Sequence, residues 1–290
     1  MSGIIVNTNL PSMMVQRNLN TATDNLNKSI ERMTTGLKIN RAADDAAGLY
    51  VANGLEKQVR GSEICESNIQ TGINILQIAE GDLSLIQEHV LRIRDLAVQA
   101  ASDYYTTDAR NAMADEAKAR YAEIDRLAAA SNFNGLNLLD GTLDDGTSAD
   151  RGLRLQVGPD SPATTNAITV TDVFKSATGA DLNLAANAAA VGTAFASASS
   201  AATFITNCDT ALTNVNNRRA AIGAVQNRLE SAYDSLTVGV ENLSAARSTI
   251  MDADIAKESS EYTKQQILQQ ASASLLVQAN QAPSIALNLI

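Results

Sequence analysis

Apolar side chains recur at helical spacing at both ends of the chain. Near the N-terminus they follow steps of three and four residues, which is the pattern of a coiled-coil seam. Residues 265–290 contain no charged side chain and carry a second apolar stripe at helical spacing. We expect the two terminal helices to pair with each other and with copies of the same chain. The residues of these predicted polymerisation seams are Val15, Leu19, Ala22, Leu26, Ile30, Met33 and Leu37 in the first helix, and Ile267, Leu268, Ala271, Leu275 and Leu276 in the second.

Between the terminal helices, a long apolar stripe begins at Ile69 and continues to Ala97. It keeps the spacing of one helical face and predicts a helix from about Asp45 to Ser102, despite two internal glycines. A polar cluster that begins at Thr106 is a capping signal for a second, shorter helix, which we expect to stop near 132–135.

The period of the pattern then changes from helical to alternating. Apolar residues alternate from Leu153 to Val157 and again around Ile168, and a turn-rich loop separates the two stretches, so a β-hairpin is predicted. The helical stripe returns at Ile205 and ends near Ile250, and this helix should run antiparallel to the first long one. The expected fold class is therefore mainly α, a long antiparallel helical bundle or coiled coil with a small β-hairpin.

Composition and charge narrow the classes of function. Aromatic residues make up 3% of the 290 residues and tryptophan is absent, so slim helical bundles fit better than a thick globular core. The formal net charge of −10, without long runs of Lys or Arg, argues against a nucleic-acid partner. No apolar run approaches the roughly 20 residues that a membrane-spanning helix needs, so no membrane partner is expected.

Candidate catalytic and metal-binding residues are sparse. The only histidine, His89, has no second histidine to complete a zinc motif and no evident nucleophile to activate. Asp44 and Asp45 are adjacent, so on a helix they would point about 100° apart and would not converge as an acid and base pair. We expect both to cap the long helix. The sequence thus predicts no enzyme, no cofactor and no metal site.

The two cysteines are predicted to be free thiols. The expected antiparallel register places position 65 beside roughly position 235, so Cys208 would lie about 40 Å from Cys65 along the bundle. A disulfide needs Cα atoms within about 7 Å. Each cysteine is therefore expected to be a small core residue.

Six separated stretches resemble bacterial flagellin. They stand in the family's order and span both ends of the chain, which makes the resemblance specific. The stretches are RAADDAAGL at 41–49, LRIRDLAVQ at 91–99, FNG at 133–135, GAVQNR at 223–228, LSAARS at 243–248 and QILQQA at 266–271.

The resemblance implies how the chain is exported and assembled, and how it divides into domains. Flagellins are exported through the flagellar type III machinery, with an export chaperone and a filament cap as partners, and assemble outside the cell into a tubular filament. By resemblance, residues 1–43 and 253–290 form an inner-tube domain and 44–252 form an outer domain. The variable outer domains of larger relatives are missing here, so any function that those insertions carry is not expected.

The resemblance also implies a recognition surface. Arg92, Leu96 and Gln99 follow the i, i+4, i+7 spacing and are predicted to share an exposed face, rotated away from the apolar stripe. In flagellins the matching positions, with an acidic residue that corresponds to Glu116, form a patch recognised by a Toll-like innate receptor and used in axial contacts.

Three functions remain distinguishable at this point. The leading hypothesis is the structural subunit of the motility filament, located outside the cell. A hook-filament junction protein has similar termini but would be a trace component of sheared filaments. A secreted coiled-coil adhesin would instead be a stable folded monomer.

Overall fold

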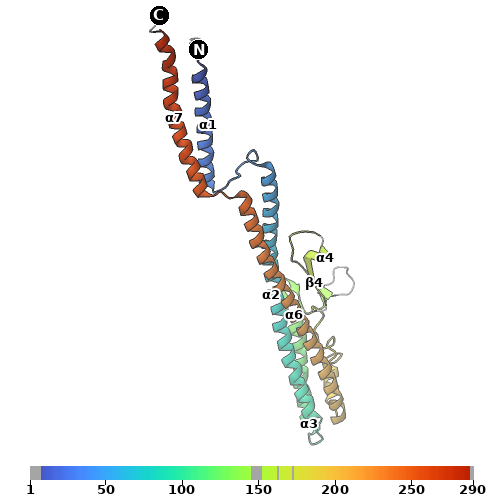
Figure 1. The fold of residues 1–290 in the computed structure, drawn as a ribbon. Coiled ribbons are helices and arrows are strands. Elements are labelled where there is room, and N and C mark those ends of the chain that lie inside the picture. Colours follow the sequence, from blue (N-terminus) through green and yellow to red (C-terminus); the bar gives the residue numbers. More distant parts are fainter. Residues whose placement is uncertain (1–7, 145–151, 162, 172, 288–290) are drawn as a thin grey trace. The chain divides into compact units, whose positions relative to one another are not determined.

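The computed structural model describes residues 8–144, 152–161, 163–171 and 173–287, with the backbone alone at 144, 163–164 and 282–287. Long helices dominate the described chain and two short antiparallel hairpins interrupt it (Figure 1). This confirms the mainly α fold class. In chain order the elements are α1 (Leu10–Thr35), α2 (Ala46–Ala100), α3 (Thr107–Ala130), β1 (Asn132–Phe133), β2 (Leu136–Asn137), a 3-10 turn η1 (Thr142–Asp144), β3 (Leu153–Gln156), α4 (Ala163–Asn166), β4 (Ala167–Val170), α5 (Ala188–Ala194), α6 (Ala198–Met251) and α7 (Ile255–Leu287).

The chain divides into two compact units, and the division falls inside α2 and α6. One unit comprises residues 60–240, which we call the central unit. The other, which we call the terminal unit, comprises residues 1–59 and 241–290.

In the central unit, α2 and α6 run antiparallel. Arg94 Nε donates a hydrogen bond to Asp209 Oδ1 at 2.6 Å, and the guanidinium of Arg219 donates one to Glu80 Oε1 at 2.7 Å. Further along, Glu66 accepts a hydrogen bond from the Thr237 hydroxyl, so position 66 lies beside 237. The predicted register, with 65 beside roughly 235, is confirmed.

The core of the central unit is formed by α2, α3, α6 and the segment between β4 and α6. Ile69, Leu83 and Ile93 on α2 are fully buried, as are Phe174 and Phe195 in the connecting segment. Phe174 and Phe195 thus contribute large side chains to this core. The capping signal at Thr106 is also confirmed, because its side chain accepts a hydrogen bond from the amide of Ala109.

A tight β1–β2 hairpin follows α3, where the sequence predicted only the end of a helix. Phe133 pairs with Leu136, and the two turn residues, Asn134 and Gly135, have φ of 51° and 81°. Asn-Gly is the dipeptide preferred in such two-residue turns, because both positions need positive φ. The signal was present in the sequence, but the strands are too short to show an alternating pattern.

The predicted β3–β4 hairpin is confirmed, with Leu155 opposite Ile168 and Gln156 opposite Ala167. Its loop contains the short helix α4, which the sequence did not predict. The hairpin packs on α2 at a glycine: a Cβ built at Gly72 would overlap the side chain of Leu155. Gly72 therefore lets the hairpin approach the helix closely.

In the terminal unit, α1 and α7 lie side by side, and the described chain ends are at the same end of the pair (Figure 1). Gly36 ends α1 in the left-handed conformation, and Leu37 then forms an isolated β-bridge with Asp252. The expectation that the terminal helices pair is confirmed.

The two adjacent aspartates, Asp44 and Asp45, accept hydrogen bonds from different parts of the backbone. Asp45 Oδ1 accepts a hydrogen bond from the amide of Gly48 at the start of α2, as a helix cap does. Asp44 instead accepts from the amides of Asn40 and Arg41, and these bonds lower the pKa of its carboxyl. The prediction that both residues cap the helix is therefore wrong for Asp44, which closes the preceding turn.

Candidate assembly and recognition surfaces

The seam of α1 follows a regular heptad that passes through a polar residue. Ala22 and Ser29 are buried, and Val15, Leu19, Leu26, Met33 and Leu37 are half-buried. Ile30, which was predicted to belong to this seam, is exposed. The position of Ile30 has a simple cause: the alternating steps of four and three residues that pass through Leu19, Ala22 and Leu26 continue by three to Ser29 and by four to Met33, and the adjacent Ile30 falls on the outer side of the helix.

The surface of α7 that faces α1 is also polar. Gln265 is buried, and Gln269 donates from its side-chain amide to the Thr23 hydroxyl at 3.0 Å. Arg32 and Glu258 form an ion pair at 3.1 Å. The apolar pattern of α7 does not indicate this seam, because most of the seam residues are polar. The signal was the spacing of glutamine and serine, since Gln265, Gln269, Ser272 and Leu276 follow steps of four, three and four residues.

The large apolar side chains of α7 therefore lie outside the helix pair. Ile267 is 61% exposed and Leu275 53%, and Leu268 is exposed as well. Of the predicted seam residues on α7, only Leu276 is half-buried. Ile267, Leu268 and Leu275, which were predicted as residues of the polymerisation seam, are therefore not covered by α1 within one subunit. The exposed apolar side chains of the two helices, Ile30, Ile267, Leu268, Leu275 and Val277 with Leu10, Met13 and Met14 near the start of α1, have no cover in the described chain.

A second surface is formed by α2 and α3. Arg92 Nε donates to Glu116 Oε1 at 2.9 Å, and the two side chains are 43% and 38% exposed. This hydrogen bond lowers the pKa of the Glu116 carboxyl and raises the pKa of the Arg92 guanidinium. Gln99 is exposed further along the helix. The structure thus brings Arg92 and Glu116 into contact, as expected for one patch.

Leu96 does not belong to that surface. Its side chain is only 2% exposed, and it is part of the core of the central unit. The prediction of an exposed Leu96 is wrong because α2 is flanked by both α3 and α6. Its buried face is therefore wider than a two-helix seam and takes in Leu96 between Ile93 and Ala100.

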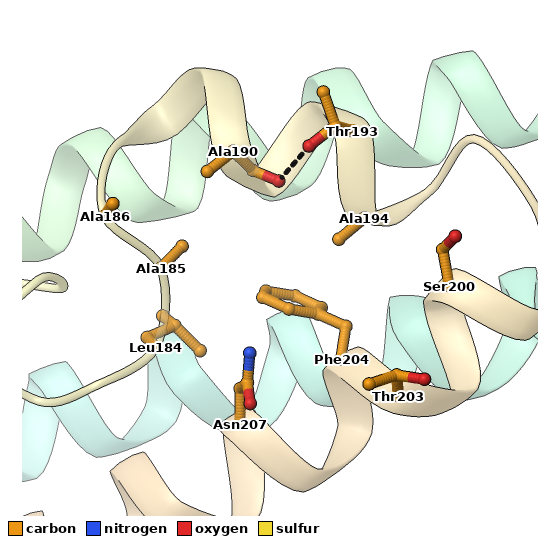
Figure 2. Close-up of a pocket in the computed structure, with 10 residues that line it drawn as sticks. All are labelled: Leu184, Ala185, Ala186, Ala190, Thr193, Ala194, Ser200, Thr203, Phe204 and Asn207. Atoms are coloured by element: carbon orange, nitrogen blue, oxygen red, sulfur yellow. Dashed lines mark hydrogen bonds between the residues drawn. The ribbon is translucent and has the colours of Figure 1, made fainter.

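The described residues contain no cluster of three or more His, Cys, Asp or Glu side chains arranged to hold a metal ion. His89 lies 3.4 Å from a guanidinium nitrogen of Arg120. A pocket between α5 and the start of α6 is lined mostly by alanine, serine and threonine around the ring of Phe204, and none of its lining residues is an acid, a base or a metal ligand (Figure 2). The hydrogen bond drawn there, from Thr193 to the carbonyl of Ala190, belongs to the helix itself.

Both cysteines are free and buried, which confirms the prediction of two separate core thiols. Burial raises the pKa of the Cys208 thiol to about 12 and raises that of Cys65 as well. A thiol is reactive as the thiolate, so neither group is activated. Among the helices that the structure describes, none combines the length and the apolar character needed to cross a membrane.

Comparison with known proteins shows which family the chain resembles. Residues 6–144 match the family model for the bacterial flagellin N-terminal helical region, and residues 205–290 match that for the C-terminal helical region. The chain is 37% identical over 279 residues to the flagellar filament 30.7 kDa core protein of Treponema maltophilum, covering 96% of each chain. It is also 37% identical to the flagellin of Bacillus subtilis (strain 168), covering 98% of this chain and 99% of that one.

A solved structure shares the fold. It is a putative flagellar hook-associated protein from Vibrio parahaemolyticus, with a TM-score of 0.55 and 16% identity over 72% of this chain and 100% of that chain. At this identity the likeness concerns the fold alone. The two family models and the relatives matched along nearly their full length establish that this chain belongs to the bacterial flagellin family.

Proposed function

We propose that this chain polymerises through the apolar side chains that α1 and α7 leave exposed. Its membership of the flagellin family, together with its similarity to filament core proteins along the whole chain, identifies it as a structural subunit of the extracellular flagellar filament. The neighbours are therefore copies of the same chain. The proposal concerns which residues make that contact.

The observation that carries the proposal is the arrangement of α7. Its buried side is polar, and its large apolar side chains, including Ile267 and Leu275, lie on the outside. Burying apolar surface stabilises an association by roughly 25 cal/mol for each Å² removed from water. A helix pair that uses polar residues inside and keeps apolar ones outside is arranged to bind further helices.

Replacing Leu275 with Asp tests the proposal. The subunit should fold normally, because the side chain is already exposed, but polymerisation should be lost, because every subunit contact would bury an unpaired charge. Leu275→Met, which keeps the volume and adds no charge, is the matched control and should polymerise. Pelleting after salt-induced assembly measures the outcome, and normal filaments from Leu275→Asp would refute this contact.

The inner and outer domains are proposed with the boundaries expected from the family, with 1–43 and 253–290 in the inner tube and 44–252 outside. We also propose the flagellar type III export machinery, an export chaperone and the filament cap as partners. These proposals rest on membership of the family. Limited proteolysis of monomer and filament tests the domains, because the terminal segments should become resistant to protease only on assembly.

A second proposed role is recognition by a Toll-like receptor through Arg92, Gln99 and Glu116. The observation that favours it is the exposed contact between Arg92 and Glu116, which places two charged groups on one surface. Leu96 is excluded from direct contact by its burial.

We propose no catalytic activity for this subunit, in keeping with the structural role of the family. The filament subunit is favoured over a junction protein and over an adhesin by the filament core proteins among its relatives. Sheared filaments should consist almost entirely of this chain if the assignment holds.

A further inference from the structure

One side of α2 is exposed and uncharged over five helical turns. Every exposed residue of this helix from Ser67 to Leu85 is uncharged, in a chain where 19% of residues carry a charge. The two charged residues in this stretch, Glu80 and Asp82, are half-buried, and Glu80 is held by Arg219. We call these exposed residues of 67–85 the α2 outer face.

Two large apolar side chains stand on this face with a glycine between them. Ile78 is 40% exposed and Leu85 is 47% exposed, and they are seven residues apart, so they lie on the same side of the helix. Gly81 lies three residues after Ile78 and four before Leu85. The glycine therefore lies about one turn from each of the two apolar side chains, on the same side of the helix.

No contact among the described residues explains Gly81. A Cβ built at this position would meet no atom within 4 Å, whereas one built at Gly72 of the same helix would overlap Leu155. Glycine inside a helix is less stable than alanine, because it has more backbone freedom to lose on folding. Gly81 therefore destabilises the isolated subunit without improving its packing.

We propose that the α2 outer face is a contact between copies of this chain, in which a neighbouring subunit packs over Gly81 between Ile78 and Leu85. Close approach of a second helix is a common structural reason for a glycine on a helix surface. The inference rests on the proposed function, in which copies of the chain are the partners, and names a further surface by which they meet.

The charge distribution favours a second copy as the occupant. Each subunit carries a net charge of −10, so two copies repel each other unless their contact avoids like charges. The α2 outer face meets that condition. The α2 outer face also lies in line with Arg92 and Gln99 of the predicted recognition patch. Ile78, Leu85, Arg92 and Gln99 follow one another at intervals of seven residues along one side of α2.

The substitution Gly81→Ala distinguishes a contact between subunits from an effect on the α2 helix within the monomer. The substitution should raise the midpoint of thermal unfolding of the monomer, because alanine favours the helix and its Cβ meets open space. It should also raise the critical concentration for polymerisation by roughly tenfold, because the added methyl group stands where a neighbour must approach. The variant should thus be more stable as a monomer and less able to polymerise. A general loss of folding does not produce that combination.

Gly223→Ala is the matched control. Gly223 lies inside α6, and a Cβ there would also meet no atom within 4 Å, but no exposed large apolar side chain lies within four residues of it. The control should raise the unfolding midpoint and leave the critical concentration unchanged. If both variants raise the critical concentration equally, helix stiffness is the cause and the proposed contact is wrong. It is also wrong if Gly81→Ala polymerises like the wild type.

A chemical label locates the contact directly. Because Cys65 and Cys208 are buried, a cysteine introduced as Ser84→Cys is the accessible thiol of the folded subunit. Maleimide should label it in the monomer and should react at least roughly tenfold more slowly in filaments of the purified protein. Equal labelling in monomer and filament would overturn the proposal. A wild-type chain that fails to polymerise at all would instead contradict the proposed function.

Discussion

Leu96 and Arg92 lie four residues apart on α2 and have different environments. Leu96 is almost fully buried in the core of the central unit, and the Arg92 side chain is exposed beside Glu116. Leu96 is therefore expected to act on the stability of the subunit, and Arg92 on contact with a partner, although the family pattern places both on one surface. Substitutions at the two positions should separate the effects.

Leu96→Ala should destabilise the subunit by roughly 2 to 5 kcal/mol, because it removes buried methyl groups and leaves a cavity. Arg92→Ala should leave stability almost unchanged, because its ion pair is exposed and solvent screens it. It should instead weaken activation of a Toll-like receptor by the monomer. Urea unfolding and a receptor reporter assay measure the two outcomes, and an equal loss of stability in both variants would contradict the assignment.

At the scale of elements, the glycines of α2 have different roles. Gly72 is buried under Leu155 of the β3–β4 hairpin, so alanine there must displace either the hairpin or the helix. We expect Gly72→Ala to destabilise the monomer by roughly 1 to 3 kcal/mol, which outweighs the helix preference of about 1 kcal/mol. Thermal unfolding checks this, with Gly81→Ala expected to shift the midpoint upward. An upward shift for Gly72→Ala as well would mean that the hairpin does not pack closely at this position.

The long elements could be predicted from the sequence because their apolar stripes persist over many turns. The bounds of α2 and α3, the register of α2 against α6 and the β3–β4 hairpin follow from those patterns and are confirmed. The terminal seams could not be located in the same way. On α1 the apolar pattern follows the buried side except at Ser29, which is buried in place of Ile30. On α7 it selects the outer side, because Gln265 is buried while Ile267 lies outside.

The short elements were missed for a different reason. The segment between β4 and α6 is held by individual hydrogen bonds, such as those from Arg218 to the carbonyls of Lys175 and Ser176 and from the Tyr121 hydroxyl to the carbonyl of Ala185. Bonds of this kind connect residues far apart in the chain. They leave no periodic trace in the sequence.

At the scale of the whole molecule, the two compact units have different kinds of interior. The central unit encloses a continuous apolar core that runs from Ile69 on α2 to Leu229 on α6. Among the described residues, the terminal unit has a small buried apolar cluster, formed by Ile39, Ala52 and Met251, beside the polar seam of α1 and α7. We infer that the central unit carries most of the stability of the monomer, and that the terminal helices gain theirs on assembly.

Deletion of Gln265–Ile290 tests this division of labour. The truncated chain should keep the unfolding transition of the central unit, because none of the deleted residues belongs to its core. It should not polymerise, because α1 loses its partner and the exposed apolar side chains of α7 are gone. Circular dichroism should show a loss of helical signal no larger than the terminal helices α1 and α7 account for, and electron microscopy should show no filaments. A truncated chain that loses the main unfolding transition would mean that the central unit depends on α7, and one that still forms filaments would mean that the terminal pair does not hold the subunits together.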